Sequence, residues 1–443
     1  MKNKISTTIL LTGLSLGTIY SQNLNKPKLD SLLDILAEKN KAMGSLTISK
    51  NGSVLYSRAI GYSFISDNEN ISATKKTKYR IGSISKMFTA TMIFQLIEEG
   101  KLNLTTTLDK YFPELPNASI ITISNLLNHR SGLHNFVADP DYLTWMTQPK
   151  THDEMLAIIS KNKADFQPNE KASYSNSNYL ILGYIIEKIS EKPYSEELNK
   201  RIISKIGLIN TYSGSKTDIN NNESASYNYL YNWNQEPETE LSNAGGGGGI
   251  VSTPTDLTKF IEALFSLKLV SQNSLDKMKT ITDGYGMGMF QIPFYTKIAY
   301  YHGGQIDGFR SHLAYFPEDS VAVAYCSNGQ IYPLNDILIG VLSIYFGRDY
   351  LIPTFNTLQL TAKDLDKYSG IYSNTQIPLK ITIFKDNLTL LSQAPGEKSI
   401  PLEATGKDEF RFYQWGIKVT FDTDKDEFIW EQGGGSYLFT KDK

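Results

Sequence analysis

Two features are nearly absent from the sequence: cysteine, and an excess of charge of either sign. One cysteine, Cys326, occurs in 443 residues, so the chain can form neither an internal disulfide nor a metal site with several thiolates. The 44 Lys and Arg residues nearly balance the 46 Asp and Glu residues, for a net charge of -2. This balance excludes a basic field for nucleic acid and an acidic tail. The 32 glycines and 16 prolines are too few for a collagen-like or low-complexity chain.

The length and the hydrophobic content are those of an ordinary globular protein. At about 100 to 200 residues per domain, the 443 residues allow two to four domains. Hydrophobic residues make up 40% of the sequence and charged residues 20%. A chain this long buries most of its surface on folding, so it needs no disulfides for stability.

The first residues have the pattern of a secretion signal. Lys2 and Lys4 precede an apolar stretch from Ile9 to Ile19, and the small residue Ser21 follows. The stretch is too short to span a bilayer, so we predict that residues 1–21 are a cleaved signal peptide. An N-terminal helix, frayed or anchored, is the alternative. We therefore expect an exported protein without stable membrane insertion, located in the periplasm or the medium if its source is a bacterium.

The next 330 or so residues alternate between strand-like and helix-like patterns. Apolar residues at helical spacing predict helices at 27–43, 83–100, 174–190 and 334–346. Alternating patterns predict strands at 44–49, 54–61, 312–316 and 321–325, with Asn51-Gly52 as the first hairpin turn. Early and late strands around a helical middle predict one sheet built from both chain ends, with a helical insertion.

The character of the sequence changes after Pro353. Short alternating segments separated by turn residues predict seven strands, at 371–372, 379–384, 388–391, 410–413, 419–421, 428–430 and 437–439. We therefore predict a small all-β domain over residues 354–443, either a barrel or a sandwich.

A Ser-x-x-Lys motif, Ser83 to Lys86, stands at the start of a predicted helix. Residues three apart share one helix face, so the hydroxyl and the amine can meet. Serine needs an adjacent base to act as a nucleophile, and a lysine whose charged form is disfavoured can serve. Alternatively, Ser83 only caps the helix and Lys86 is a solvated residue of its first turn. A lysine in a first turn is electrostatically unfavourable, which favours the functional interpretation.

Two further motifs follow in order: Tyr174-Ser175-Asn176 and His302-Gly303-Gly304. With these three motifs the sequence resembles the serine β-lactamase and DD-peptidase superfamily, especially the branch of class C β-lactamases, D-aminopeptidases and esterases. Flanking segments at 79–90, 126–133 and 244–253 match as well.

The resemblance implies an α/β fold of β-lactamase/transpeptidase type, in which helices flank an antiparallel sheet beside a helical region. It covers about residues 30–350, so we assign a hydrolase domain to 22–353. The tail resembles the lipocalin-like β-domain that some members of this branch append.

Catalytic roles for three residues follow from the resemblance. Ser83 would attack a carbonyl group and carry the acyl group, and Lys86 would accept or relay its proton. Tyr174 would share the role of base and protonate the leaving group, and the charge of Lys86 would favour its phenolate.

The resemblance also implies residues that bind the substrate. Asn176 would hold Lys86 and the substrate amide. The backbone N–H groups of Ser83 and Gln305 would form the oxyanion hole. His302 would stand in the third motif, and Gly303 and Gly304 would let the strand edge approach the acyl group.

The third motif departs from the usual pattern, which is Lys-Thr-Gly or Lys-Ser-Gly in penicillin-recognising enzymes. Histidine, with an ordinary pKa of about 6.5, is mostly neutral at pH 7 and offers no fixed cation. Recognition of a substrate carboxylate is therefore disfavoured. Arg310 could compensate, although nothing in the sequence places it in the cleft.

Other candidate sites are weaker. The five glycines at 245–249 lack the residues of a P-loop and are interpreted as a flexible cleft loop. His129 and His134 have no neighbouring carboxylate or cysteine cluster, so we predict neither zinc nor any other metal, and no cofactor. His129 and Tyr174 could each be packed core residues.

The sequence therefore predicts an exported serine hydrolase that works through an acyl-enzyme. Its substrate would be a small peptide, amide or ester, with D-amino-acid-containing peptides favoured, as in DD-carboxypeptidases and D-aminopeptidases. A β-lactamase, a carboxylesterase and a slow-turnover penicillin-binding protein are the alternatives. The sequence leaves the oligomeric state open.

Overall fold

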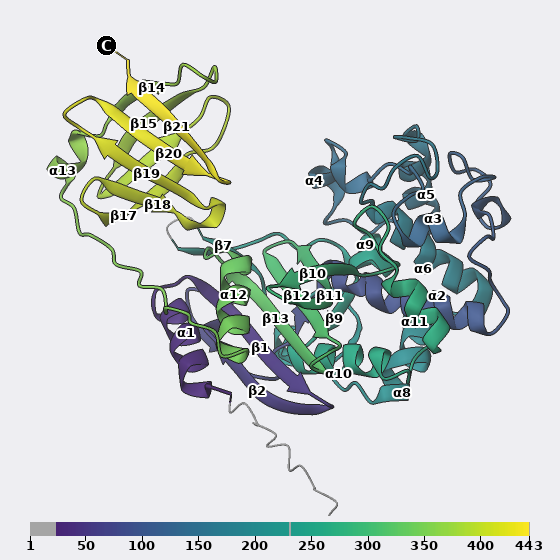
Figure 1. Ribbon diagram of the computed structural model, residues 1–443. Helices are drawn as coiled ribbons and strands as arrows, with labels where there is room; N and C mark the ends of the chain where they lie inside the picture. Colours follow the sequence, from purple (N-terminus) through teal and green to yellow (C-terminus); the bar gives the residue numbers. More distant parts are fainter. Residues whose placement is uncertain (1–23, 230–231, 443) are drawn as a thin grey trace, which may run out of the picture.

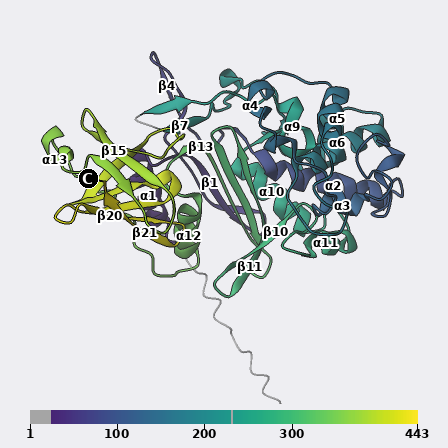
Figure 2. The ribbon, with the colours of Figure 1, turned by 90° about the horizontal axis from the view of Figure 1, so that it is seen from above.

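The computed structural model describes residues 24–229 and 232–442 (Figure 1). The predicted signal peptide lies outside the described residues. A larger α/β part is followed by a small barrel, and Figure 2 shows the helical region on the side of the central sheet away from that barrel.

A six-stranded antiparallel sheet has the order β10-β11-β12-β13-β1-β2. Its strands are β1 (Ala42–Lys50), β2 (Ser53–Ile60), β10 (Phe290–Phe294), β11 (Lys297–Ile306), β12 (Phe309–Phe316) and β13 (Val321–Gln330). Because β1 pairs with β13, strands from both ends of the chain meet at its centre. This confirms the predicted sheet, to which the structure adds β10 and β11. The β1–β2 turn has positive φ values of 51° at Asn51 and 79° at Gly52, as the hairpin signal predicts.

Helices and short strands complete the α/β part. The helices are α1 (Lys26–Glu38), α2 (Ser85–Glu98), α3 (Ile123–Leu127), α4 (Tyr142–Trp145), α5 (His152–Lys161), α6 (Asn176–Ser190), α7 (Tyr194–Leu198), α8 (Ser204–Ile206), α9 (Leu241–Gly248), α10 (Pro254–Phe265), α11 (Gln272–Lys279) and α12 (Leu334–Tyr345). The short strands are β3 (Tyr62–Ile65), β4 (Asn70–Ser72), β5 (Tyr79–Arg80), β6 (Tyr212–Ser213), β7 (Tyr227–Tyr229), β8 (Trp233–Gln235) and β9 (Ile250–Ser252).

Both faces of the sheet are covered, so its central strands are buried throughout. In β13, Val323 and Tyr325 pack into one core with α1 and α12. The alternate residues Ala324 and Cys326 belong to a second core, which contains α2, α6 and α10. Because successive side chains of β13 point to opposite faces of the sheet, this strand contributes residues to both cores. The single cysteine is a buried, free thiol whose pKa burial raises.

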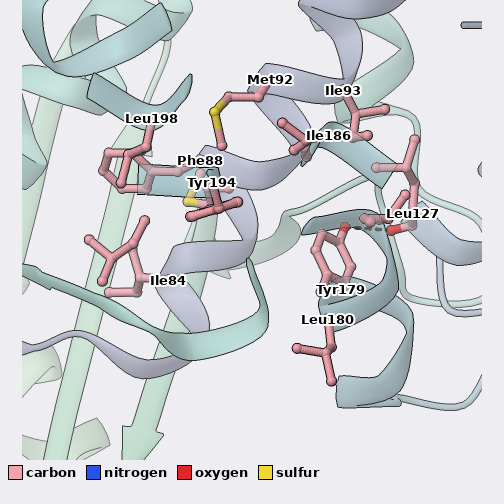
Figure 3. Packing of buried hydrophobic residues seen from close by; sticks show 14 of the residues in the cluster. Ile84, Phe88, Met92, Ile93, Leu127, Tyr179, Leu180, Ile186, Tyr194 and Leu198 are labelled. Atoms are coloured by element: carbon pink, nitrogen blue, oxygen red, sulfur yellow. Dashed lines mark hydrogen bonds between the residues drawn. The ribbon is translucent and has the colours of Figure 1, made fainter. Parts of the chain in front are cut away.

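The second core fixes α2 against α6, the two helices that carry the first two motifs (Figure 3). Phe88 of α2 stacks on Phe260 of α10. The hydroxyl of Tyr179 in α6 donates a hydrogen bond of 2.7 Å to the carbonyl oxygen of Leu127. These contacts anchor α2 to α10 and α6 to α3 within this core.

The five-glycine run corrects the expectation of a flexible loop. Gly246, Gly247 and Gly248 are buried in α9, which has a non-helical residue at Gly245. A Cβ at Gly246 would lie 2.7 Å from the carbonyl oxygen of Tyr179 and 3.1 Å from the Cα of Gly183. The missing side chains therefore let α9 pack directly against the backbone of α6.

The tail forms a closed eight-stranded barrel, which decides between the barrel and the sandwich. Its strands are β14 (Gly370–Ser373), β15 (Lys380–Asp386), β16 (Thr389–Gln393), β17 (Ile400–Gly406), β18 (Glu409–Phe412), β19 (Ile417–Asp422), β20 (Glu427–Gln432) and β21 (Gly435–Lys441), preceded by α13 (Ala362–Asp366). The sequence pattern misses β17, where Pro401 interrupts the alternation of Ile400 and Leu402.

The barrel contacts the α/β part through a buried lysine. Lys41 is 3% exposed, and its Nζ lies 2.5 Å from Glu403 Oε2 on β17. The same ammonium lies 4.3 Å from the ring centre of Tyr413. Across the described residues, no helix has the length and apolar character needed to cross a membrane.

Candidate active site

The segment around Ser83 is pressed against β11. Gly82 has a φ of 50°, and a Cβ there would lie 2.9 Å from the backbone nitrogen of Gln305. A Cβ at Gly304 would lie 2.0 Å from the carbonyl oxygen of Ile81. Neither position can hold a side chain, because the backbones of the two segments lie in direct contact there. Gly304 thus lets β11 pack against the segment before Ser83, whereas we expected it to let the strand edge approach the acyl group.

Ser83 lies in a single 3-10 turn (Gly82–Ile84) that leads directly into α2. Lys86 follows one turn later and is completely buried. Its Nζ lies 3.0 Å from Ser83 Oγ, 2.8 Å from Asn176 Oδ1 and 2.7 Å from the carbonyl oxygen of Gly247. The predicted meeting of the hydroxyl and the amine is present, which rules out a solvated Lys86.

Burial lowers the pKa of Lys86 well below that of a free lysine. A neutral amine has two N–H donors and one lone pair. Asn176 Oδ1 and the Gly247 carbonyl oxygen can only accept, so they use the two donors. The lone pair then faces Ser83 Oγ, whose proton it can accept.

Tyr174 lies directly before α6, and its ring centre is 4.9 Å from Lys86 Nζ. Burial raises the pKa of the Tyr174 phenol, and a hydrogen bond with Ser83 offsets part of this rise. The phenol therefore stays protonated. This corrects the expected phenolate, because a buried, neutral Lys86 supplies no charge to stabilise one.

Asn176 is the first residue of α6, and Asn135 holds it in place. The backbone nitrogen and Nδ2 of Asn176 donate to Asn135 Oδ1 at 3.0 and 3.2 Å. Its Oδ1 is thereby left to accept from Lys86. The sequence predicted the contact between Asn176 and Lys86 but gave no signal for Asn135.

His302 lies in the middle of β11 and is 3% exposed. Burial is the main cause that lowers the pKa of His302 to about 3. Its Nδ1 lies 2.5 Å from the carbonyl oxygen of Gly303. The third motif thus holds a neutral ring. Arg310 does not replace it, because its guanidinium donates to the carbonyl oxygens of Asp307 and Phe309.

A cavity of about 350 Å³ opens in front of Ser83. Asn176, Gln305 and Gly247 line it together with Ser83. The cavity walls also include segments 136–146, 236–244 and 305–307. Lys86, Tyr174 and His302 do not line this cavity: Lys86 and His302 are buried, and Tyr174 is half-buried. The seven predicted site residues therefore lie together around Ser83, some in the cleft and some beneath it.

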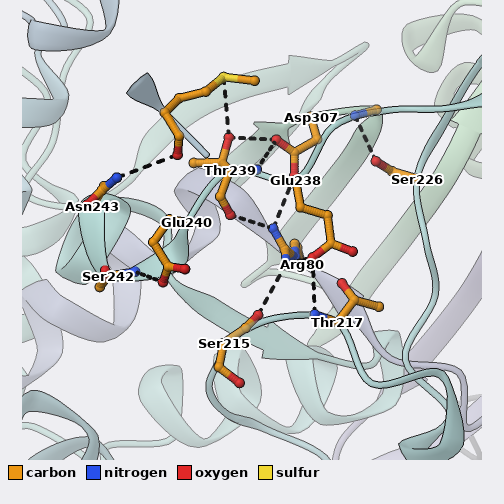
Figure 4. Close-up of polar contacts among 12 residues, drawn as sticks. Arg80, Ser215, Thr217, Ser226, Glu238, Thr239, Glu240, Ser242, Asn243 and Asp307 are labelled. Carbon is orange, nitrogen blue, oxygen red and sulfur yellow. Dashed lines mark hydrogen bonds and ion pairs between the residues drawn. The ribbon is translucent and has the colours of Figure 1, made fainter. Parts of the chain in front are cut away.

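One wall of the cleft is held by Arg80, three residues before Ser83 (Figure 4). Its guanidinium donates to the carbonyl oxygen of Thr239 at 2.7 Å and to Glu238 at 2.7 Å. It also lies 3.2 Å from Asp307, in the turn after β11. Arg80 thus ties the 236–240 segment and the β11–β12 turn to the nucleophile segment, a role that no sequence motif indicated.

The two histidines considered for zinc have other partners. His129 stacks on Tyr174 at 4.4 Å, and its Nδ1 accepts from the backbone nitrogen of Ser175. His134 pairs with Asp139 and Asp165. Among the described residues, no group of three or more His, Cys, Asp or Glu side chains is arranged so that it could hold a metal ion. His129 therefore supports the Tyr174 ring.

Comparison with known proteins agrees with this geometry. A sequence model described as Beta-lactamase matches residues 32–337. Penicillin-binding protein 4* of Bacillus subtilis is 25% identical over 453 residues, covering 92% of this chain and 97% of that protein. Teichoic acid D-alanine hydrolase of Staphylococcus aureus is 31% identical over 38% of this chain and 40% of that protein. The structure of D-amino acid amidase from Ochrobactrum anthropi SV3 aligns with a TM-score of 0.65 at 26% identity, covering 73% of this chain and 99% of that one.

Proposed function

Because this chain belongs to the β-lactamase family of serine hydrolases, we propose that Ser83 is the nucleophile of an acyl-enzyme mechanism. Ser83 Oγ bonds to the substrate carbonyl carbon while its proton moves to the Lys86 amine. The bond to the leaving nitrogen or oxygen then breaks, and Tyr174 supplies the proton to the leaving atom. The Lys86 ammonium passes its proton to the Tyr174 oxygen, which restores both groups. Water then cleaves the acyl ester and restores Ser83.

The observation that carries this proposal is the set of three contacts of Lys86 Nζ. Two acceptors hold the amine, and Ser83 Oγ at 3.0 Å is its third neighbour. Burying a lysine lowers its pKa and destabilises the folded protein. A role as the base for Ser83 would explain why the fold contains such a residue. A protonated Tyr174 beside Lys86 complements the base with an acid.

The negative charge that develops on the substrate oxygen would be stabilised by backbone N–H groups. We assign this role to Ser83, at the N-terminal side of α2, and to Gln305 on β11. Asn176 lines the cleft as well as holding Lys86, so it would also contact the substrate amide.

For the substrate we propose small peptides, amides or esters of D-amino acids. The related amidase and D-alanine hydrolase act on such compounds by their names. The neutral His302 weakens the case for a β-lactamase or a DD-carboxypeptidase, because both must bind a substrate carboxylate. We further propose export, on the basis of the charged and apolar pattern of residues 1–21.

A panel of substrates tests this function. We expect hydrolysis of a D-amino-acid p-nitroanilide or p-nitrophenyl ester by the wild type. Hydrolysis should be abolished in Ser83→Ala, and a chromogenic cephalosporin should be turned over much more slowly. Equal activity of Ser83→Ala on every substrate would reject the proposal. Rapid, lasting acylation by penicillin without turnover would instead identify a slow penicillin-binding protein.

A further inference from the structure

We propose that the cleft selects substrates that carry a protonated amino group, through the carboxylate of Glu236. This inference rests on the function proposed above and sharpens its substrate class. It assigns aminoacyl esters, aminoacyl amides and peptides with a free N-terminus to the site, in preference to N-acylated peptides that end in a carboxylate.

The charges on the cleft walls are all negative. The side chains of the cavity lining that can carry a charge at neutral pH are two carboxylates, Glu236 and Asp307, with no Lys, Arg or His among them. Asp307 is already occupied, because Arg80 lies 3.2 Å away and Thr239 donates to it from both its backbone nitrogen and its hydroxyl. Glu236 is therefore the carboxylate that remains available to a substrate.

Glu236 has a polar partner but no close cation. Its Oε1 accepts a hydrogen bond of 2.5 Å from Asn228 Nδ2, which orients the carboxylate. Within the described ranges, 24–229 and 232–442, no Lys, Arg or His lies within ion-pair distance of it. Arg310 attracts Glu236 at longer range, but its guanidinium is bonded to the carbonyl oxygens of Asp307 and Phe309. A partly exposed carboxylate so placed can form a charge-assisted hydrogen bond with an ammonium group.

The backbone around Glu236 is fixed before any substrate binds. The backbone nitrogen of Glu236 donates to the carbonyl oxygen of Ser226 at 2.8 Å. Two and three residues later, Glu238 and Thr239 are held by Arg80 (Figure 4). A carboxylate on a rigid wall loses little entropy on binding, so its contribution to selectivity is retained.

The rest of the site supports the same preference. His302 is neutral and buried, so the third motif offers no cation to a carboxylate. Apolar residues, Val137, Leu143 and Met146, line the rest of the cavity and suit a small aliphatic side chain. A cleft with one free negative charge and no positive one attracts cationic acyl donors and repels anionic ones.

Protection of Ser83 from a labelled fluorophosphonate tests this inference without requiring turnover. The competitors are D-alaninamide and N-acetyl-D-alaninamide, compared at pH 6.5, where an α-amino group with a pKa of about 7.7–8 is protonated. We expect the free amine to protect at least about tenfold more strongly in the wild type. That preference should largely disappear in Glu236→Gln, which keeps an acceptor for Asn228. In Glu236→Lys, N-succinyl-D-alaninamide should become the better competitor.

Glu318→Gln is the matched control, since it removes one negative charge from an exposed position in the β12–β13 turn. This variant should keep the wild-type preference. Equal protection by both competitors in the wild type, or an unchanged preference in Glu236→Gln, would overturn the inference while leaving the acyl-enzyme mechanism intact. Absence of fluorophosphonate labelling at Ser83 would instead overturn the proposed function, and the inference with it.

Discussion

The α/β part and the barrel both have large hydrophobic cores, but they differ in the polar groups that they bury. The α/β part buries Lys86, His129, Asn178 and His302 around one pocket. In the barrel, the described polar side chains that are buried are Asn374 and Ser392. Tyr372, Phe410 and other aromatic rings fill its core.

The difference in buried polar side chains distinguishes the part that contains the candidate active site from the barrel. Burying a polar group costs free energy unless it is well paired, so a fold without a reaction to perform tends to avoid it. The barrel follows this rule, with aromatic rings packed against one another. The α/β part departs from it at Lys86, whose hydrogen-bond partners orient it toward Ser83. A buried amine that is held by neutral acceptors thus distinguishes the functional site independently of the sequence motifs.

Replacing Lys86, the proposed base, should have the largest effect on activity. It is also the sharpest test of the comparison between the two parts. We expect Lys86→Met to lower kcat/KM by about a thousandfold, because Ser83 then lacks a group to take its proton. Circular dichroism should still show a folded protein. Activity within tenfold of the wild type would mean that the buried polarity of this pocket is structural.

Removing one phenol should have the next largest effect. Tyr174→Phe is expected to lower kcat by about a hundredfold, with the steepest loss for substrates that have poor leaving groups, such as amides. Tyr179→Phe is the matched change, since that phenol lies nearby, in α6, but donates to the carbonyl oxygen of Leu127. It should cost about 1 kcal/mol of stability with little loss of rate. Similar rates for both variants would remove Tyr174 from the mechanism.

Mild acid should destabilise the α/β part selectively, since all five histidines precede residue 354. Burial lowers the pKa of His302 to about 3 and that of His312 to about 4. Below about pH 6.5 the unfolded chain binds protons that the folded chain cannot, so stability present above pH 6.5 is lost as the pH falls. At pH 5 the loss is about 2 kcal/mol for each such histidine.

Thermal unfolding of His312→Gln at pH 7 and pH 5 measures this effect. The variant should show a smaller decrease in Tm between the two pH values than the wild type. His134 acts in the opposite direction, because Asp165 and Asp139 raise its pKa, but its contribution is common to both proteins. Identical pH shifts in Tm would show that His312 is not the source.

The smallest effect on activity is expected at the contact between the two parts. Lys41 is buried like Lys86 and its pKa is also lowered by burial, but its partners are Glu403 and the ring of Tyr413. Lys41→Met should change kcat/KM by less than about twofold while lowering Tm, since it leaves Glu403 without its cation. A loss of rate comparable to that of Lys86→Met would contradict the assignment of function to one region.

The sequence predicted the features that depend on local pattern. The three motifs, the Asn51-Gly52 hairpin, the sheet built from both chain ends and most barrel strands follow from spacing and alternation. The structure places Ser83, Lys86, Tyr174 and Asn176 together as the resemblance implied.

The features that depend on tertiary packing were not predictable. The glycine run suggested a loop, but close contact with α6 makes it a helix that supplies the carbonyl oxygen of Gly247 to Lys86. The protonation states of Lys86 and Tyr174 follow from burial, which a motif does not encode. No sequence pattern indicated the role of Arg80, which contacts residues distant along the chain, or of Glu236, which belongs to none of the motifs.

The central claim is that Ser83 carries the acyl group during turnover. Mass spectrometry of protein quenched with acid while it hydrolyses a D-amino-acid p-nitrophenyl ester tests this most directly. We predict an adduct of the mass of the acyl group on the peptide that contains Ser83, formed together with a burst of p-nitrophenol and absent from Ser83→Ala. An adduct on a different residue, or turnover by Ser83→Ala at the wild-type rate, would contradict the account.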